Sequence, residues 1–406
     1  MRKKWQLFRA TDFQSLMDPC FTFCQILGVF PYKITALTFE ISKPHYILST
    51  IVICLQLISL LIILYIINIF ERDFKGIPRA LERNCFYILT SFVAIVTYIL
   101  SGSRMRLLQT IKEISSKLPP ESYRKLSRLI HIKDILGFVY LLCEIPIYHQ
   151  MNVSVVIKIL MTYIMLLIFQ MDMLYMNCVC VLKACFKRID DSLEHIRQII
   201  MENEMNHHNE MSYKQRSLFL LIKLKALKKQ HLMIIDTVQM LNMTFSLQLL
   251  ATVVITFIEI TFKFYFYILY WQKGVSMIPM DDSIYFTFLT INTIFYFSKI
   301  TLMAWACETG KEQAQLIGTT VHDVLNNTSD NEIKSELQSF SLQILHNKVK
   351  FSAKGLTIDA TLLTAMMGTI STYLLILVQF LNMSNFCNKE IVINMTQITQ
   401  HNKNII

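Results

Sequence analysis

Two charged residues of opposite sign lie inside a long apolar segment of the sequence. Glu259 and Lys263 are four residues apart, so on a helix their side chains lie on one face within reach of each other. A charge at the centre of a membrane helix costs about 2.5–3.5 kcal/mol on insertion scales, so such groups usually pair or face water. The two residues therefore form either an intrahelical salt bridge or one wall of a polar ligand cavity, and the sequence leaves both open.

Further polar and aromatic residues flank the same end of neighbouring apolar segments and are predicted to share that cavity. They are Glu144, Tyr148 and His149, then Tyr267, Tyr270 and Trp271, and finally Asp281, Tyr285 and Asn292. Tyr and Trp also gather at membrane–water interfaces without binding a ligand, so an interfacial belt is the alternative for the aromatic members. Asp172 lies in the middle of another apolar segment and is expected to have an internal polar partner.

The sequence offers no catalytic or metal-binding arrangement. It lacks the His-Glu-x-x-His, Gly-x-Ser-x-Gly and phosphate-loop patterns, and no acids and histidines cluster on one helical face. Cys178, Cys180 and Cys185 lie on one apolar segment without further partners at zinc spacing. We therefore expect neither enzymatic activity nor a cofactor or bound metal.

The composition indicates a polytopic helical membrane protein. Of the 406 residues, 53% are hydrophobic and 17% are charged, and the mean hydropathy is +0.43. Soluble domains are about 45–50% apolar and about 25% charged, so a soluble enzyme and a disordered chain are both excluded. The net charge of +10 comes from Lys and Arg residues that lie between apolar segments. These residues therefore indicate how the chain is oriented in a membrane, and they predict a lipid bilayer rather than a nucleic acid as partner.

Seven apolar segments are counted as membrane spans, although a spanning helix needs about 20 residues and the third segment is shorter. They cover 46–70, 85–101, 135–148, 153–186, 237–270, 284–306 and 360–383. The third is the weakest because Glu144 and Pro146 interrupt it. Most Lys and Arg lie before the first span, after the second and fourth, and before the seventh, which predicts a cytoplasmic N-terminus and an extracellular C-terminus.

The resulting organisation is an all-α fold with seven transmembrane helices and a cytoplasmic helical anchor domain. Residues 1–45 form a cytoplasmic or interfacial segment, 46–186 hold spans one to four, and 187–236 extend spans four and five as cytoplasmic helices. Residues 237–308 hold spans five and six, 309–358 the anchor helices, 359–383 the last span and 384–406 an extracellular tail. The sequons at Asn152 and Asn394 are candidate glycosylation sites.

The last span carries a recognisable pattern. Thr372-Tyr373, five apolar residues and Gln379-Phe380 resemble the signature of the insect gustatory receptor family. Three further parts of the sequence resemble this family. The approach to the last helix does so at residues 340–346, Phe351, Gly355 and Asp359. The linker between the sixth and seventh spans does so at Thr309, Glu312 and His322, and the start of the fifth span at residues 236–249. The resemblance covers the C-terminal half well and the N-terminal half by architecture. Leu374 stands where the main sugar clade has Glu, which disfavours that clade.

The resemblance implies a tastant-gated, non-selective cation channel in the plasma membrane of sensory neurons, related to the insect odorant receptors. Members of this kind assemble as homotetramers or with related receptor subunits, bind a small-molecule tastant from outside among spans two to six, and line the pore with span seven. A sugar-like polyol, a flat bitter compound and an amino acid all remain open as ligands.

One face of the last span is the predicted gate. Tyr373, Ile376, Gln379 and Phe380 recur at helical spacing, so a tetramer would present four copies of each to its axis. Rings of Ile376 and Phe380 can close a pore by dewetting, and Gln379 amides can line the open path. The stripe has no acid, which predicts weak selectivity among cations. The alternative is that the stripe packs against spans five and six.

Two other function classes fit the span count less well. A G-protein-coupled receptor would need an extracellular N-terminus, and its Asp-Arg-Tyr and Asn-Pro-x-x-Tyr motifs are absent from the sequence. A membrane transporter would be expected to show an internal repeat, and none is visible.

Overall fold

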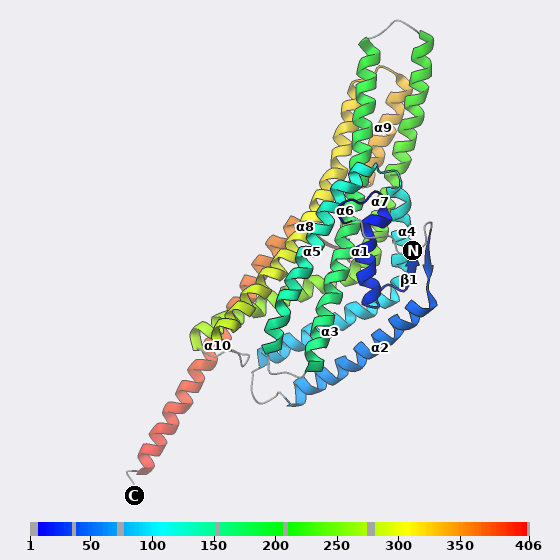
Figure 1. The fold of residues 1–406 in the computed structure, drawn as a ribbon. Helices are drawn as coiled ribbons and strands as arrows, with labels where there is room; N and C mark the ends of the chain where they lie inside the picture. Colours follow the sequence, from blue (N-terminus) through cyan, green and yellow to red (C-terminus); the bar gives the residue numbers. More distant parts are fainter. Residues whose placement is uncertain are drawn as a thin grey trace.

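The computed structural model describes residues 7–34, 38–70, 77–150, 155–205, 210–273 and 281–403, and nearly all of them are helical (Figure 1). The elements are α1 (Phe13–Ile26), β1 (Tyr32–Ile34), β2 (Phe39–Ile41), α2 (Lys43–Tyr65), the π-helical turn η1 (Ile66–Phe70), α3 (Ile77–Ile99), α4 (Ser101–Ser115), α5 (Pro120–Gln150), α6 (Val155–Met205), α7 (Glu210–Lys273), α8 (Asp282–Asn326), α9 (Asn331–His346), β3 (Ser352–Ala353), β4 (Leu356–Thr357) and α10 (Ala360–Lys403). The all-α prediction is confirmed. The two short antiparallel hairpins, β1–β2 and β3–β4, were not predicted.

Six of the described helices are long and apolar enough to cross a membrane: α2, α3, α6, α7, α8 and the part of α10 that ends at Met383. The predicted third span lies on α5, which does not meet these criteria because Lys133, Asp134 and Glu144 lie in or beside its apolar stretch. Its helix nevertheless runs without a break through Pro146 and packs against α6 and α8.

Two predicted boundaries differ from the structure. The second span was expected to begin at residue 85, but α3 is helical from Ile77 and carries Glu82 into the bundle. The Glu82 carboxylate is tolerated near the start of a span because the Lys263 ammonium group of α7 neutralises its charge. The predicted tail after residue 383 continues α10 as a helix to Lys403, seen in red in Figure 1.

Helices α6, α7 and α8 are much longer than a membrane span and extend together beyond the rest of the bundle, where α9 joins them (Figure 1). The helices that carry the predicted spans four and five, α6 and α7, thus continue past the predicted span ends. Apolar residues of this region pack on one another: Ile317, Val321 and Val324 of α8 and Leu337 and Phe340 of α9 are all buried. Their burial makes α6 to α9 a helical domain within a single chain.

Further apolar side chains of this helical domain stay exposed in the single chain. Leu218, Phe219 and Ile222 of α7 and Leu342 and Leu345 of α9 are each more than half exposed. Exposed apolar residues gathered on one surface mark an interaction site more often than isolated ones do.

The hairpin β3–β4 fixes where α10 begins. Its turn uses left-handed backbone at Lys354 (φ 51°) and Gly355 (φ 91°), and Gly adopts this conformation without steric cost. Asn242 of α7 holds the segment before the hairpin by donating to the Lys350 carbonyl at 2.7 Å and accepting from the Ser352 N–H at 3.1 Å. The side-chain amide of Asn242 is therefore engaged in tertiary structure.

Asp359 caps the N-terminus of α10. Its Oδ1 accepts from the Thr361 N–H at 3.1 Å and the Leu362 N–H at 3.4 Å. The hydrogen bond from the Thr361 hydroxyl, helped by these backbone N–H groups, lowers the pKa of the Asp359 carboxyl. The cap is thus ionised at neutral pH, and its contribution to stability is lost only as the pH falls through this lowered pKa.

Helices α5 and α6 approach each other closely at Gly137. A Cβ placed on this glycine would lie 2.4 Å from the Phe169 ring. No side chain fits at that separation unless the Phe169 ring or one of the helices moves.

We expect Gly137→Ala to lower the stability of the solubilised full-length protein, because overpacking costs about 1–3 kcal/mol. Gly318→Ala is the matched control, since its Cβ would meet Ile344 at an ordinary 3.6 Å and Ala is the better helix former. Thermal denaturation followed by size-exclusion chromatography measures both. Equal melting temperatures for the two variants would contradict the contact.

Candidate functional site

One face of α7 carries a line of buried polar side chains through the apolar bundle. Gln248, Thr252, Thr256, Glu259 and Lys263 follow one another at intervals of three or four residues, and each is at most 8% exposed. Because this spacing matches the helical repeat, all five point to the same side. We call this face, with the groups of α3, α4, α6 and α8 that bind to it, the polar column.

At one end of the column, three charged groups from two helices form a buried triad. Lys263 Nζ lies 2.7 Å from Glu82 Oε1 on α3 and 3.2 Å from Glu259 Oε2 on its own helix. The ammonium also lies 5.5 Å from the centre of the Phe288 ring on α8. The intrahelical salt bridge considered for Glu259 and Lys263 is therefore present, with Glu82 as a third member that leaves a formal charge of −1.

The middle of the column joins α6, α7 and α8. Asp172 Oδ2 lies 3.1 Å from Lys299 Nζ, and the Thr252 hydroxyl donates to Asp172 Oδ1 at 3.0 Å. Lys299 Nζ also lies 5.3 Å from the centre of the Tyr296 ring. The expectation that Asp172 has an internal polar partner is confirmed.

At its other end the column holds a buried arginine. Arg104 of α4 donates to Gln248 Oε1 at 2.7 Å, and its guanidinium carbon lies 4.8 Å from the centre of the Phe245 ring. Within the described ranges no carboxylate lies within 4 Å of it. Burial lowers the pKa of Arg104 to about 10, so the group remains charged at neutral pH.

Several groups of the column have hydrogen-bonding capacity to spare. The Thr256 hydroxyl and the Gln248 Nε2 are buried and find no hydrogen-bond partner in the part of the chain that the structure describes. Buried polar groups are normally satisfied by protein or by water, so these atoms mark where a polar molecule or water can bind.

The predicted aromatic candidates meet where α7 ends and α8 begins. The Tyr270 ring centre lies 5.9 Å from that of Tyr285 and 4.6 Å from that of Phe286, which also contacts Tyr267 at 5.1 Å. Tyr285 is buried, whereas Trp271 is 72% exposed. Asp281 immediately precedes α8 and is exposed. The structure thus brings Tyr267, Tyr270 and Tyr285 together and leaves Trp271 at the rim.

The remaining candidates lie on the neighbouring helices. Glu144 of α5 is 2% exposed and lines a small cavity of about 20 Å³ with Thr162 and Met165 of α6. It interacts with the Tyr140 hydroxyl, which donates to the Ile291 carbonyl of α8. Next to this carbonyl, buried Asn292 donates from its Nδ2 to the Phe288 carbonyl at 3.0 Å. Four predicted residues fall outside what the structure describes: the side chains of Tyr148, His149 and Asn394, and residue Asn152.

Sequence reasoning missed several members of the column: Glu82, Arg104, Gln248, Thr252 and Lys299. The three- and four-residue spacing of polar residues along α7 was a usable signal for two of them. Lys299 lies alone inside a predicted span, and an unpaired charge there calls for an acid such as Asp172.

The predicted gate stripe lies on the outer face of α10. Tyr373, Ile376 and Phe380 are 52%, 40% and 68% exposed, and Gln379 is exposed as well. The Tyr373 ring also makes an edge contact with Phe257 of α7 at 5.7 Å. The adjacent face of α10 packs through Leu374, Leu377 and Leu381 on the aromatic residues of α7 and α8.

A model of the 7tm chemosensory receptor family matches residues 17–383, which is most of the chain. The chain belongs to this family. The predicted resemblance to the insect gustatory receptors is confirmed, since the similar curated proteins are gustatory receptors of Drosophila melanogaster. Putative gustatory receptor 28b is 34% identical over 37% of this chain and 32% of its own length, and putative gustatory receptor 28a is 32% identical over 39% and 35%. The matched segment thus spans about a third of each relative.

The fold is that of an insect olfactory receptor. The structure of OR5 from Machilis hrabei superposes with a TM-score of 0.69 at 13% identity, covering 91% of this chain and 98% of the other. A second structure of OR5, in complex with eugenol, superposes equally well at 12% identity. In this seven-transmembrane fold, α5 is the remaining span, although its composition does not meet the criteria for a membrane helix.

Replacing Lys263 with Met should destabilise this receptor strongly, because Glu82 and Glu259 would remain buried without a cation. Removing one partner of a buried ion pair costs about 3–5 kcal/mol. The matched control is Lys311→Met, which breaks the half-exposed pair with Glu308 and should cost less than about 1 kcal/mol. Melting of the solubilised proteins compares them, and a Lys263 variant as stable as the control would show that the triad is not a structural requirement.

Proposed function

We propose that this receptor is a subunit of a tastant-gated, non-selective cation channel in the plasma membrane of sensory neurons. The observation that carries the proposal is the outer face of α10. A single chain leaves Tyr373, Ile376 and Phe380 largely uncovered along a helix long enough to cross a membrane. Four copies around one axis would place these faces against a common pore and close it by dewetting.

The exposed apolar side chains of α7 and α9 support assembly into a homotetramer or with related subunits. They are Leu218, Phe219 and Ile222 on α7 and Leu342 and Leu345 on α9. Burying such side chains against a second subunit is favourable by roughly 25 cal/mol per Å² of apolar surface. The same surface would keep the subunits together while α10 moves.

The tastant site is proposed between α3, α5, α7 and α8, from the aromatic cluster at Tyr270 and Tyr285 toward the Glu82–Lys263–Glu259 triad. Rings there can stack on a flat molecule or on a sugar face, and the unpaired Thr256 hydroxyl can bind a ligand hydroxyl. Leu374, Leu377 and Leu381 connect α10 to this cluster. A ligand that separates α7 from α8 would therefore shift α10 directly.

Recording from excised membrane patches of cells that lack other receptors tests the channel. Sugars, amino acids and bitter alkaloids applied to the outer face should evoke unitary cation currents without cytosol. Currents that need cytosolic G proteins, together with an N-terminal epitope accessible on intact cells, would favour the G-protein-coupled alternative and overturn the proposal.

Replacing Ile376 or Phe380 with Ser should raise the ligand-independent current several-fold, because a wetted constriction no longer blocks ions. Leu55→Ser is the control, since Leu55 is a 58% exposed apolar residue on α2, away from the stripe. Whole-cell current is normalised to surface expression. Variants with wild-type resting current, activation and permeability ratios would exclude the stripe as the gate.

A further inference from the structure

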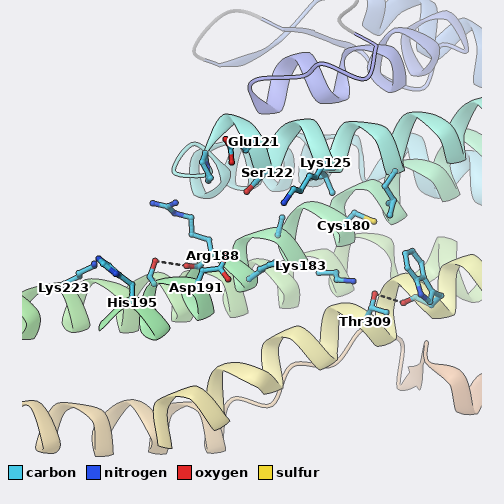
Figure 2. Close-up of a pocket in the computed structure, with 17 residues that line it drawn as sticks. Glu121, Ser122, Lys125, Cys180, Lys183, Arg188, Asp191, His195, Lys223 and Thr309 are labelled. Atoms are coloured by element: carbon cyan, nitrogen blue, oxygen red, sulfur yellow. Dashed lines mark hydrogen bonds between the residues drawn. The ribbon is translucent and has the colours of Figure 1, made fainter. Parts of the chain in front are cut away.

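A large basic cavity lies far from the aromatic cluster, between α5, α6, α7 and α8. Its volume is about 840 Å³, within the range of small-molecule sites. The first turns of α5 form one wall and the middle of α6 the other, so that Lys125 and Arg188 project from facing helices (Figure 2). Lys223 of α7 and Trp305 and Thr309 of α8 complete the lining.

The lining carries a clear excess of positive charge. Its cations are Lys125, Lys183, Lys187, Arg188 and Lys223, against the two acids Glu121 and Asp191. Across the described residues, none of these five cations forms an ion pair with a carboxylate within 4 Å. Lys228 of the same region, by contrast, pairs with Glu336 at 2.8 Å. The cavity therefore concentrates unneutralised cations with a formal excess of three.

The cavity also lies at the predicted boundary of the bilayer. The predicted spans on α6 and α8 end at residues 186 and 306, so Lys183 and Trp305 flank the point where both helices leave the membrane. Lys183 Nζ lies 5.4 Å from the centre of the Trp305 ring, and Trp305 is 45% exposed. A Trp beside Lys residues is typical of the headgroup level. Leu126 and Leu129 continue the lining on the α5 side.

We propose that this cavity binds the phosphorylated headgroup of an anionic membrane lipid. Lys and Arg are the side chains that bind phosphate, Arg in bidentate geometry and Lys as a point charge. The excess of three positive charges suits a headgroup with more than one phosphate. Trp305 and Leu129 would contact the glycerol and the start of the acyl chains. The side of the membrane that carries most Lys and Arg is also the side on which anionic lipids are concentrated.

Binding of a fluorescent dioctanoyl phosphatidylinositol bisphosphate to the full-length chain in neutral detergent tests this site by anisotropy. The combined variant Lys183→Gln, Lys187→Gln and Arg188→Gln should bind about a hundredfold more weakly, at about fivefold for each cation removed. Lys334→Gln, Lys348→Gln and Lys350→Gln together form the control, since they remove three exposed cations outside the cavity. Lys125→Gln alone should weaken binding of the probe about fivefold, and this single variant tests the site if the triple variant does not fold.

Competition separates the lipid from soluble anions. Unlabelled dioctanoyl phosphatidylcholine and inorganic phosphate should not displace the probe. Inositol trisphosphate should compete more weakly than the lipid, because it lacks the glycerol and acyl chains that would contact Trp305. Trp305→Ser should weaken binding of the lipid and leave binding of inositol trisphosphate unchanged. Equal loss in the cavity and control variants would overturn the site, and inositol trisphosphate binding as tightly as the lipid would overturn the lipid as its ligand.

Discussion

The need to neutralise charge inside an apolar bundle governs this structure. Lys263 and Lys299 lie on helices surrounded by hydrocarbon side chains, and neither ammonium could stay there without a carboxylate. Glu82, Glu259 and Asp172 provide the carboxylates from three different helices. Each of these ion pairs has a short contact distance and therefore allows little change in the positions of its two helices. The pairs thus determine how α3 and α8 are placed against α6 and α7.

The last helix is held by contacts of another kind. α10 attaches to the bundle through Leu374, Leu377 and Leu381, which pack on aromatic residues. No ion pair joins α10 to the bundle within the described residues. Apolar contacts slide at lower cost than ion pairs break, so the helix proposed to carry the gate is attached by the most deformable kind of contact in the bundle.

Long helices link the two ends of the molecule. α7 runs from the domain formed with α6, α8 and α9, past Asn242 and the β3–β4 hairpin, to the aromatic cluster at Tyr270. A continuous helix transmits a displacement along its length, and Asn242 joins this one to the segment from which α10 begins. The basic cavity lies where α5 and α8 meet the same long helices, so a lipid bound there would contact the elements that join the domain to the bundle.

The sequence by itself determined the class of protein, most of the helices and the family. Apolar segments of membrane length and the Thr372-Tyr373 to Gln379-Phe380 pattern are local properties of the chain, and the Asp359 cap acts on the next turn. The tertiary structure alone decided which charges pair. Glu82 and Lys263 are far apart in the sequence, as are Asp172 and Lys299, so helical periodicity cannot relate them. The start of α3 depends on those long-range contacts, because a charged residue is stable inside the bundle only once its partner from another helix is there. The basic cavity depends on how α5, α6, α7 and α8 pack together.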